Sequence, residues 1–377
     1  MKTKVKSESG GVTAFVAIFV SAFLLFGSIA LALDSGVLYL ERRTLSNAAQ
    51  SSALALAREC IERPTNCSSY GLIQTLANEN SPDGLTTVSE ICINGKTQQG
   101  LDCQPLTASK VDCSPLPTNV TKFVRIRTQS LSSSPGIGLQ TFFSRSNSHS
   151  LDACAQVRWG NAGSAAVYAP FAVSICEWAK QQSLPRVLLE FKTNDSVSSC
   201  TFSFVDLAGQ TFTRNGISGW AALDLLSASL PSGARASVSC PNPATDQPAY
   251  LQIGHQLSQI ARDQSSINYC GNGTLISKIG SWLNQDLYLP LISTQKLSGS
   301  ATIHTVEAFA AFRLLGYSLQ KGSGSASDVG GTTPTGNWCP KNTNCIYGEF
   351  KATISPGSEL SDQPGVPNVG LQAIELF

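Results

Sequence analysis

Charged side chains are scarce in this sequence. Asp, Glu, Lys and Arg together make up 14% of its 377 residues, well below the roughly 25% that soluble domains carry. The formal net charge is +1 and no basic block is present, so the electrostatic footprint of a nucleic-acid-binding protein is missing. Hydrophobic residues make up 42%, which is enough for a buried core. We therefore expect a globular chain with no nucleic-acid partner.

The motifs of common enzyme classes are also missing. The sequence has no G-x-S-x-G pentapeptide, no Walker loop and no dinucleotide fingerprint. The three histidines, His149, His255 and His304, have no His or carboxylate at metal-ligand spacing. Glu177 beside Trp178 could be a carboxylate with a raised pKa, but no second carboxylate accompanies it. We predict no catalytic residue, no metal site and no cofactor.

Paired cysteine spacing of the C-x-x-C kind is absent, although the chain has 12 cysteines. Zinc sites usually need such spacing, whereas an even number of cysteines in an exported chain predicts disulfides. We predict six. Two look local, because Cys60 and Cys67 flank Pro64, and Cys339 and Cys345 bracket a turn-rich loop. Cys92, Cys103 and Cys113 lie close enough in the chain for one more local pair, with the third cysteine pairing elsewhere. The full set is Cys60, Cys67, Cys92, Cys103, Cys113, Cys154, Cys176, Cys200, Cys240, Cys270, Cys339 and Cys345.

One apolar run is long enough to cross a membrane. Val12–Leu33 spans about 33 Å as a helix, against a bilayer core of about 30 Å. Lys residues precede the run, which places the N-terminus in the cytoplasm and the rest outside. The alternative is a cleaved signal peptide, since Ala30–Ala32 fits an A-x-A cleavage site. A retained anchor is favoured because no Pro occurs before Pro64, so one helix can run on past the membrane.

The residues after the membrane span predict a second stretch of the same helix, ending near Glu62. Its apolar positions recur at three-, four- and seven-residue steps along one Ala-rich face. This face packs either on the chain's own domain or, as a stalk, against other subunits. We name it as a candidate subunit packing face, formed by Leu38, Leu45, Ala49, Ala53 and Leu56.

Beyond Pro64 the pattern is mainly that of strands. Apolar and polar residues alternate around 124–128, 153–159, 234–240, 346–354 and 369–373, and 187–191 is a short apolar run. Helices are predicted at Tyr70–Asn80, Gly219–Ser229 and Gln252–Arg262, whereas Thr305–Leu319 suits a strand or a helix. Turn-rich stretches at 94–117, 131–150 and 321–337 predict loops.

These patterns predict an α+β fold, with a long N-terminal transmembrane and stalk helix before a disulfide-rich, mainly β extracytoplasmic region. The expected divisions are a cytoplasmic N-terminus (1–11), a transmembrane helix (12–33), a stalk helix (34–62), a first extracytoplasmic α+β region (63–160) and a second, mainly β region (161–377). The five tryptophans are either core residues or stacking platforms for sugars, and the core interpretation is preferred for disulfide-rich domains.

Three segments of the N-terminal part follow each other in a distinctive order, namely Ser9–Ala14 (SGGVTA), Leu33–Tyr39 (LDSGVLY) and Arg42–Ala55 (RRTLSNAAQSSALA). In this order they resemble the TadE/TadG-like family of Flp/Tad pilus assembly. Gln50 stands where the family often has Asp. Further segments match long members of the family more loosely: Ala172–Trp178, Ser218–Asp224, Leu289–Ile292, Ala308–Phe312 with Gly316–Tyr317, and Cys345–Phe350.

The resemblance implies a non-enzymatic, membrane-anchored component of Flp/Tad (type IV-like) pilus assembly, with an anchoring or minor pilin-like role in cell adhesion. Its partners would be the cytoplasmic membrane and pilus-assembly proteins or pilin-like subunits. Cleaved pseudopilins of this machinery carry a Glu inside the apolar run, where this chain has Phe15 and apolar neighbours. The alternatives are a cell-envelope binding module or adhesin not tied to pili, and an extracytoplasmic hydrolase.

Overall fold

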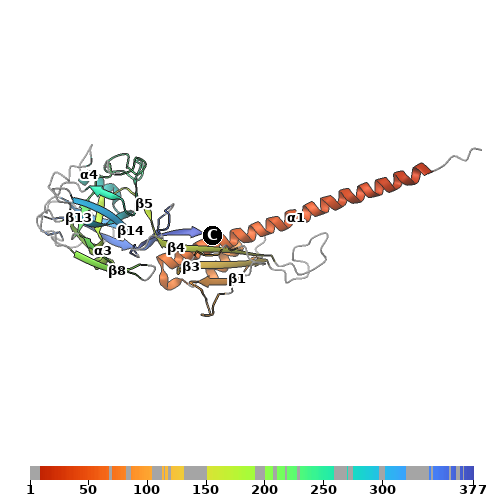
Figure 1. The fold of residues 1–377 in the computed structure, drawn as a ribbon, viewed down its shortest axis with the longest axis horizontal. Helices are drawn as coiled ribbons and strands as arrows, with labels where there is room; N and C mark the ends of the chain where they lie inside the picture. The colour runs from red at the N-terminus through yellow and green to blue at the C-terminus, as the bar shows by residue number, and fades with distance from the viewer. Residues whose placement is uncertain are drawn as a thin grey trace, which may run out of the picture.

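The computed structural model describes most of the chain. The described residues are 9–67, 70–81, 86–103, 113, 115–117, 120–130, 151–191, 200–206, 210–216, 219–226, 230–258, 270, 275–296, 302–319, 339–340, 343–355, 358–361, 366–367 and 369–377. The loops expected at 131–150 and 321–337 lie outside these residues. The architecture is one long N-terminal helix followed by a mainly β region (Figure 1).

Helix α1 (Ser9–Glu62) is a single unbroken element of 54 residues, about 80 Å long at the standard helical rise. Its N-terminal half extends away from the globular part, and its C-terminal half lies on a sheet (Figure 1). The helix ends before η1 (Pro64–Asn66), because proline cannot donate the next backbone hydrogen bond. Helix α2 (Tyr70–Glu79) then packs beside the end of α1, in agreement with the expected Tyr70–Asn80 helix.

The first sheet has six strands in the order β16-β17-β4-β3-β1-β2. Its members are β1 (Thr86–Ile93), β2 (Lys96–Thr97), β3 (Phe123–Ser130), β4 (Asp152–Asn161), β16 (Thr353–Ile354) and β17 (Leu371–Leu376). All neighbours are antiparallel except β16 and β17. Val124, Ile126 and Val157 are fully buried with Ala49 and Ala53 of α1, so the helix and the sheet share one core.

The order of this sheet corrects the expected boundary at residue 160. Strand β17 pairs with β4 along Gln372–Leu376, more than 200 residues later in the chain. The chain thus leaves the first sheet after β4, builds a second unit and returns to complete the first. The reason is apolar burial at both units, since Leu371 and Ala373 are fully buried at their junction.

The second unit is a sheet of seven strands, with the path β10-β6-β13-β14-β15-β7 and β12 paired to β14. The strands are β6 (Phe171–Ser174), β7 (Val187–Phe191), β10 (Trp220–Ala222), β12 (Gln256–Ser258), β13 (Asp286–Lys296), β14 (Thr302–Ser318) and β15 (Asn344–Lys351). Because β10 also contacts β7, the sheet curls until its two ends meet. Alternate residues such as Leu289, Ala310 and Phe312 fill the interior.

Smaller elements surround this curled sheet. They are β5 (Ser164–Val167) paired with β11 (Ala249–Gln252), the hairpin β8 (Cys200–Val205) and β9 (Thr211–Gly216), α3 (Ile175–Gln181), α4 (Leu275–Ile279) and η3 (Gly280–Trp282). Trp282 of η3 is fully buried, meets Phe171 edge-on at 5.7 Å between ring centroids, and donates from Nε1 to the carbonyl of Pro241 at 3.1 Å. These contacts close the core from outside the sheet.

The two units share a hydrophobic core. Leu371 and Ala373 of the first sheet are buried in the same cluster as Ile292 of β13 and Phe309 of β14, and Ala162, directly after β4, joins them. The Tyr288 hydroxyl also donates to the carbonyl of Ile354 at 3.4 Å. We therefore describe the globular part as one head built from two joined sheets.

Three expectations about local structure are wrong. Gly219–Ser229 begins with the short strand β10 instead of a helix, and Gln252–Arg262 contains the end of β11 and β12, with 259–262 outside the described residues. Both stretches contain a glycine with positive φ, Gly219 at 87° and Gly254 at 86°, which breaks a helix. The alternating stretch 234–240, expected as a strand, forms turns and bends. Thr305–Leu319, for which the sequence leaves a strand and a helix both open, lies almost wholly in β14.

All twelve cysteines form disulfides, as the sequence predicts. The two local pairs are confirmed, with Cα–Cα distances of 4.3 Å for Cys60–Cys67 and 5.9 Å for Cys339–Cys345. One further local pair forms, and the next cysteine reaches a distant strand, also as expected. The remaining bridges are Cys92–Cys103, Cys113–Cys154, Cys176–Cys200 and Cys240–Cys270.

Candidate functional site: the exposed helix and the sheet that holds it

The N-terminal half of α1 presents a long apolar surface to its surroundings. Phe19 is 71% exposed, Phe23 is 84% exposed and Leu31 is 64% exposed, although burying such side chains is strongly favourable in water. The helix is long and apolar enough to cross a membrane. In water this surface would be a liability, so its environment is best explained by lipid or by another apolar helix.

The few polar side chains of this half are compatible with an apolar environment. The hydroxyl groups of Ser21, Ser28 and Ser35 each donate to a backbone carbonyl of the preceding turn, at 2.7–2.8 Å. Such bonds satisfy the hydroxyl without water. The residues of the A-x-A pattern, Ala30–Ala32, lie within the continuous helix. The apolar half is therefore a direct continuation of the part that packs on the head.

The predicted subunit packing face is occupied by the chain's own sheet. Leu45, Ala49 and Ala53 are 0% exposed and Leu56 is 1% exposed, while Leu38 is half-buried. The partners are β3 and β4, which cross this part of α1. Thr128 of β3 adds a hydrogen bond from its hydroxyl to the Leu45 carbonyl, at 2.9 Å. Of the two alternatives for this face, the structure shows packing on the chain's own domain, because alanines let the strands approach the helix closely.

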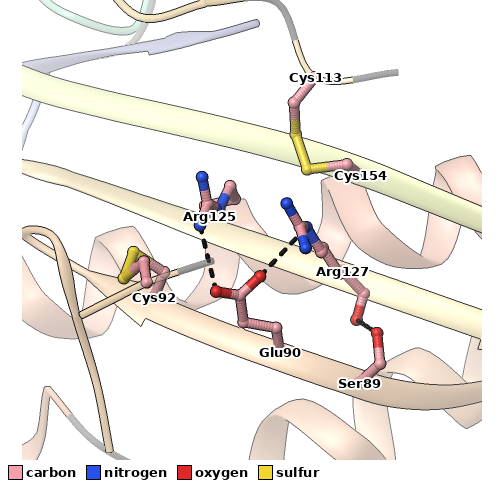
Figure 2. A network of polar contacts seen from close by, with 8 residues as sticks. Ser89, Glu90, Cys92, Cys113, Arg125, Arg127 and Cys154 are labelled. Atoms are coloured by element: carbon pink, nitrogen blue, oxygen red, sulfur yellow. Dashed lines mark hydrogen bonds and ion pairs between the residues drawn. A yellow bond between two sulfur atoms is a disulfide. The ribbon is translucent and has the colours of Figure 1, made fainter. Parts of the chain in front are cut away.

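A cluster of buried charges lies on the opposite face of the first sheet (Figure 2). Glu90 of β1 accepts a hydrogen bond from Arg125 and forms an ion pair with Arg127, each with an N–O distance of 3.1 Å. The three side chains are only 8%, 7% and 13% exposed, respectively. At this depth each charge depends on the others, because an uncompensated buried charge costs several kcal/mol.

Strand register explains why these charges meet. Glu90 stands opposite Arg127, which in turn stands opposite Cys154, and opposed residues project from the same face of an antiparallel pair. Cys92 and Arg125 form the next row in the same way. The cluster thus lies between two disulfides, Cys92–Cys103 and Cys113–Cys154 (Figure 2). These bridges fix segments from the β2–β3 connection on both sides of the charged side chains.

The described residues that were considered for catalysis are buried or take part in hydrogen bonds within the fold. Glu177 of α3 accepts hydrogen bonds from the Gln181 side chain and, at 3.4 Å, from the Gly219 amide, so it joins α3 to the start of β10. Burial lowers the pKa of His255, whose Nδ1 accepts from the Gln252 amide at 3.1 Å. His304 is fully buried, and His149 lies outside the described residues.

Four of the five tryptophans are core residues. Trp159, Trp178, Trp220 and Trp282 are at most 9% exposed, and Trp338 lies outside the described residues. Their faces pack inside the head, so these four provide no platform for a sugar. Within the described ranges, no group of three or more His, Cys, Asp or Glu side chains is placed to hold a metal ion.

Comparison with known proteins adds no assignment. No protein-family model matches the chain, no curated protein is similar to it, and no solved structure matches its fold. The function is therefore argued from the residues and the geometry described above.

Proposed function

We propose that this chain is a non-enzymatic, membrane-anchored component of Flp/Tad-type pilus assembly, with an anchoring or minor pilin-like role. One observation carries the proposal. A single helix of 54 residues has an exposed apolar N-terminal half and a C-terminal half that forms one core with an antiparallel sheet. An anchor and a head joined in this way move as one body, which suits a subunit that is held or presented at a membrane.

The order of the N-terminal segments supports the same function. The glycines at 10 and 11, the exit segment Leu33–Tyr39 and the Ala-rich segment Arg42–Ala55 all lie on α1. The exit segment begins where the head first covers the helix, since Asp34 is 7% exposed whereas Leu33 is 52% exposed. The exit segment thus coincides with the change from the exposed apolar helix to the head-packed helix, and the Ala-rich segment lies on the head-packed part.

The proposed topology has the N-terminus in the cytoplasm and the head outside the membrane. Lys2, Lys4 and Lys6 precede the apolar run, and basic residues favour the cytoplasmic side. The six disulfides of the head favour the same side for it, because they persist in oxidising compartments. Burial of four tryptophans removes the feature that most favoured a sugar-binding module.

Two experiments test this proposal. Intact mass of the membrane fraction should give the full chain, less at most Met1, and a mature N-terminus at Leu33 would contradict a retained anchor. Deletion of the gene should reduce or abolish thin surface pili and leave growth nearly normal. A deletion strain with a normal number of pili and normal attachment would count decisively against a role in pilus assembly.

A further inference from the structure

One row of α1 residues remains apolar and exposed beyond the membrane span. We call it the seam and define it as Phe23, Phe26, Ala30, Leu33, Val37 and Leu40, which follow each other at alternating three- and four-residue steps. This spacing is the heptad pattern of helices that pack along each other. Apart from the half-buried Ala30, these side chains are 45–84% exposed.

The outer end of the seam is the informative part. Within the apolar run every row of the helix is apolar, so any row would satisfy the pattern there. Between residues 34 and 43, however, the helix also carries charged and small polar residues, and the only apolar side chains are those of positions 37 to 40. Leu38 faces the head and is half-buried, whereas Val37 and Leu40 continue the seam and are 45% and 61% exposed.

Lipid tails do not account for this exposure. The run that ends at Leu33 already fills a hydrocarbon core of about 30 Å, and Leu40 lies about 10 Å further along the axis. Val37 and Leu40 therefore stand at or beyond the headgroup layer. Exposed apolar side chains at this level are expected to be covered by protein.

The described residues of the head leave the seam accessible. The row of α1 that faces the head contains Asp34, Leu45 and Ala49, all buried. Leu33 precedes Asp34, so the seam is rotated by about 100° from the head-facing row. At later positions of the same row the residues become polar, with Thr44, Asn47 and Ser51. A second helix can follow the seam up to Leu40 and then diverge, which leaves room for its own head.

We propose that α1 pairs in parallel with α1 of a second copy of this chain along the seam. This inference rests on the membrane placement in the proposed function. Every copy carries the same seam at the same depth and in the same orientation, and Ala30 allows close approach of two backbones. Along the paired stretch, Gly36 would face the partner's Glu41, so no like charges oppose each other.

The test uses the absence of a free thiol in the native chain, where all twelve cysteines are paired. Leu40→Cys places one thiol on the seam. Tyr39→Cys is the matched control, because Tyr39 is 66% exposed at the same depth but on another side of the helix. After mild oxidation of membranes that contain the full chain, L40C should give several-fold more disulfide-linked homodimer than Y39C. Equal or lower dimer formation by L40C, or linkage mainly to a different protein, would overturn the pairing.

A second measurement does not depend on thiol chemistry. Val37→Glu would set two carboxylates against each other in the pair, whereas Tyr39→Glu adds the same charge away from the seam. Recovery of an untagged copy with a tagged copy from solubilised membranes should fall several-fold for V37E and little for Y39E. Equal recovery with both variants would contradict the pairing, even if L40C failed to fold.

Membrane extraction of the same samples separates this inference from the proposed function. Chain that is extracted as a soluble protein would overturn the anchor and the pairing together. Chain that stays in the membrane without preferential L40C linkage would overturn the pairing and leave the anchor intact.

Discussion

Substitution of Glu90 by Gln should strongly destabilise the head. The Glu90 carboxylate is 8% exposed and lies 3.1 Å from a nitrogen of Arg125 and 3.1 Å from a nitrogen of Arg127. The neutral amide would leave two guanidinium groups buried without the charge that compensates them. Loss of one partner from a buried ion pair costs about 3–5 kcal/mol, a large share of the 5–15 kcal/mol that stabilises a typical domain.

The same sheet provides a matched control. Glu375 of β17 pairs with Arg158 of β4, but Glu375 is 46% exposed. Ion pairs of this kind contribute about 0–1 kcal/mol, so Glu375→Gln should have little effect. The comparison keeps residue type, charge change and sheet constant, and varies the depth of the carboxylate and the number of its arginine partners.

Urea unfolding of the full chain in detergent, followed by Trp fluorescence, measures both variants. Trp159 is buried in the core between α1 and the first sheet and reports on that unit. The unfolding midpoint should fall far more for E90Q than for E375Q. In addition, Arg125→Met should cost less in the E90Q background than in the native chain, because the two residues are coupled. Equal midpoints for E90Q and E375Q would refute the reasoning about buried charge.

Three further predictions follow from packing and titration. Ala53→Leu should cost about 1–3 kcal/mol in urea unfolding, since Ala53 is 0% exposed against the sheet, and an unchanged stability would contradict that packing. Gly219→Ala should lower the yield of folded chain, because the added Cβ would lie 1.9 Å from the Glu190 carbonyl oxygen and the backbone φ is 87°. Gly71→Ala is the control and should be neutral or stabilising, because a Cβ added there meets no atom within 4 Å. Burial lowers the pKa of His255 below the ordinary histidine value of about 6.5. The stability that the neutral imidazole contributes is therefore present above that value and is lost as the pH falls below it. An NMR titration that gives a pKa of about 6.5 or higher for His255 would contradict this prediction.

Sequence reasoning succeeds where local pattern determines the structure. The continuity of α1 follows from the absence of Pro before Pro64, and the Cys60–Cys67 bridge follows from the chain reversal beside it. Strands β3 and β4 follow from period-2 alternation. In each case the decisive residues are neighbours along the chain.

It fails where distant segments decide. Alternation around Arg125 and Arg127 predicts a polar outer face, yet both side chains are buried with Glu90, about 35 residues earlier in the chain. The pairing of β17 with β4 depends on Leu371 and Ala373 fitting a core shared by two sheets, which no local pattern encodes. The same limit applies to the Ala-rich face of α1, because periodicity identifies an apolar face but not what covers it.

Pilus number in a complemented deletion strain tests the central claim most directly. One strain carries the full chain, and the other carries the same head behind a cleavable signal peptide in place of residues 1–33, with export and disulfide formation verified in both. The proposed function predicts that thin surface pili return only with the full chain, because the head must remain attached to its membrane helix. Pili restored equally by the released head, or a normal number of pili in the deletion strain before either chain is returned, would contradict the account.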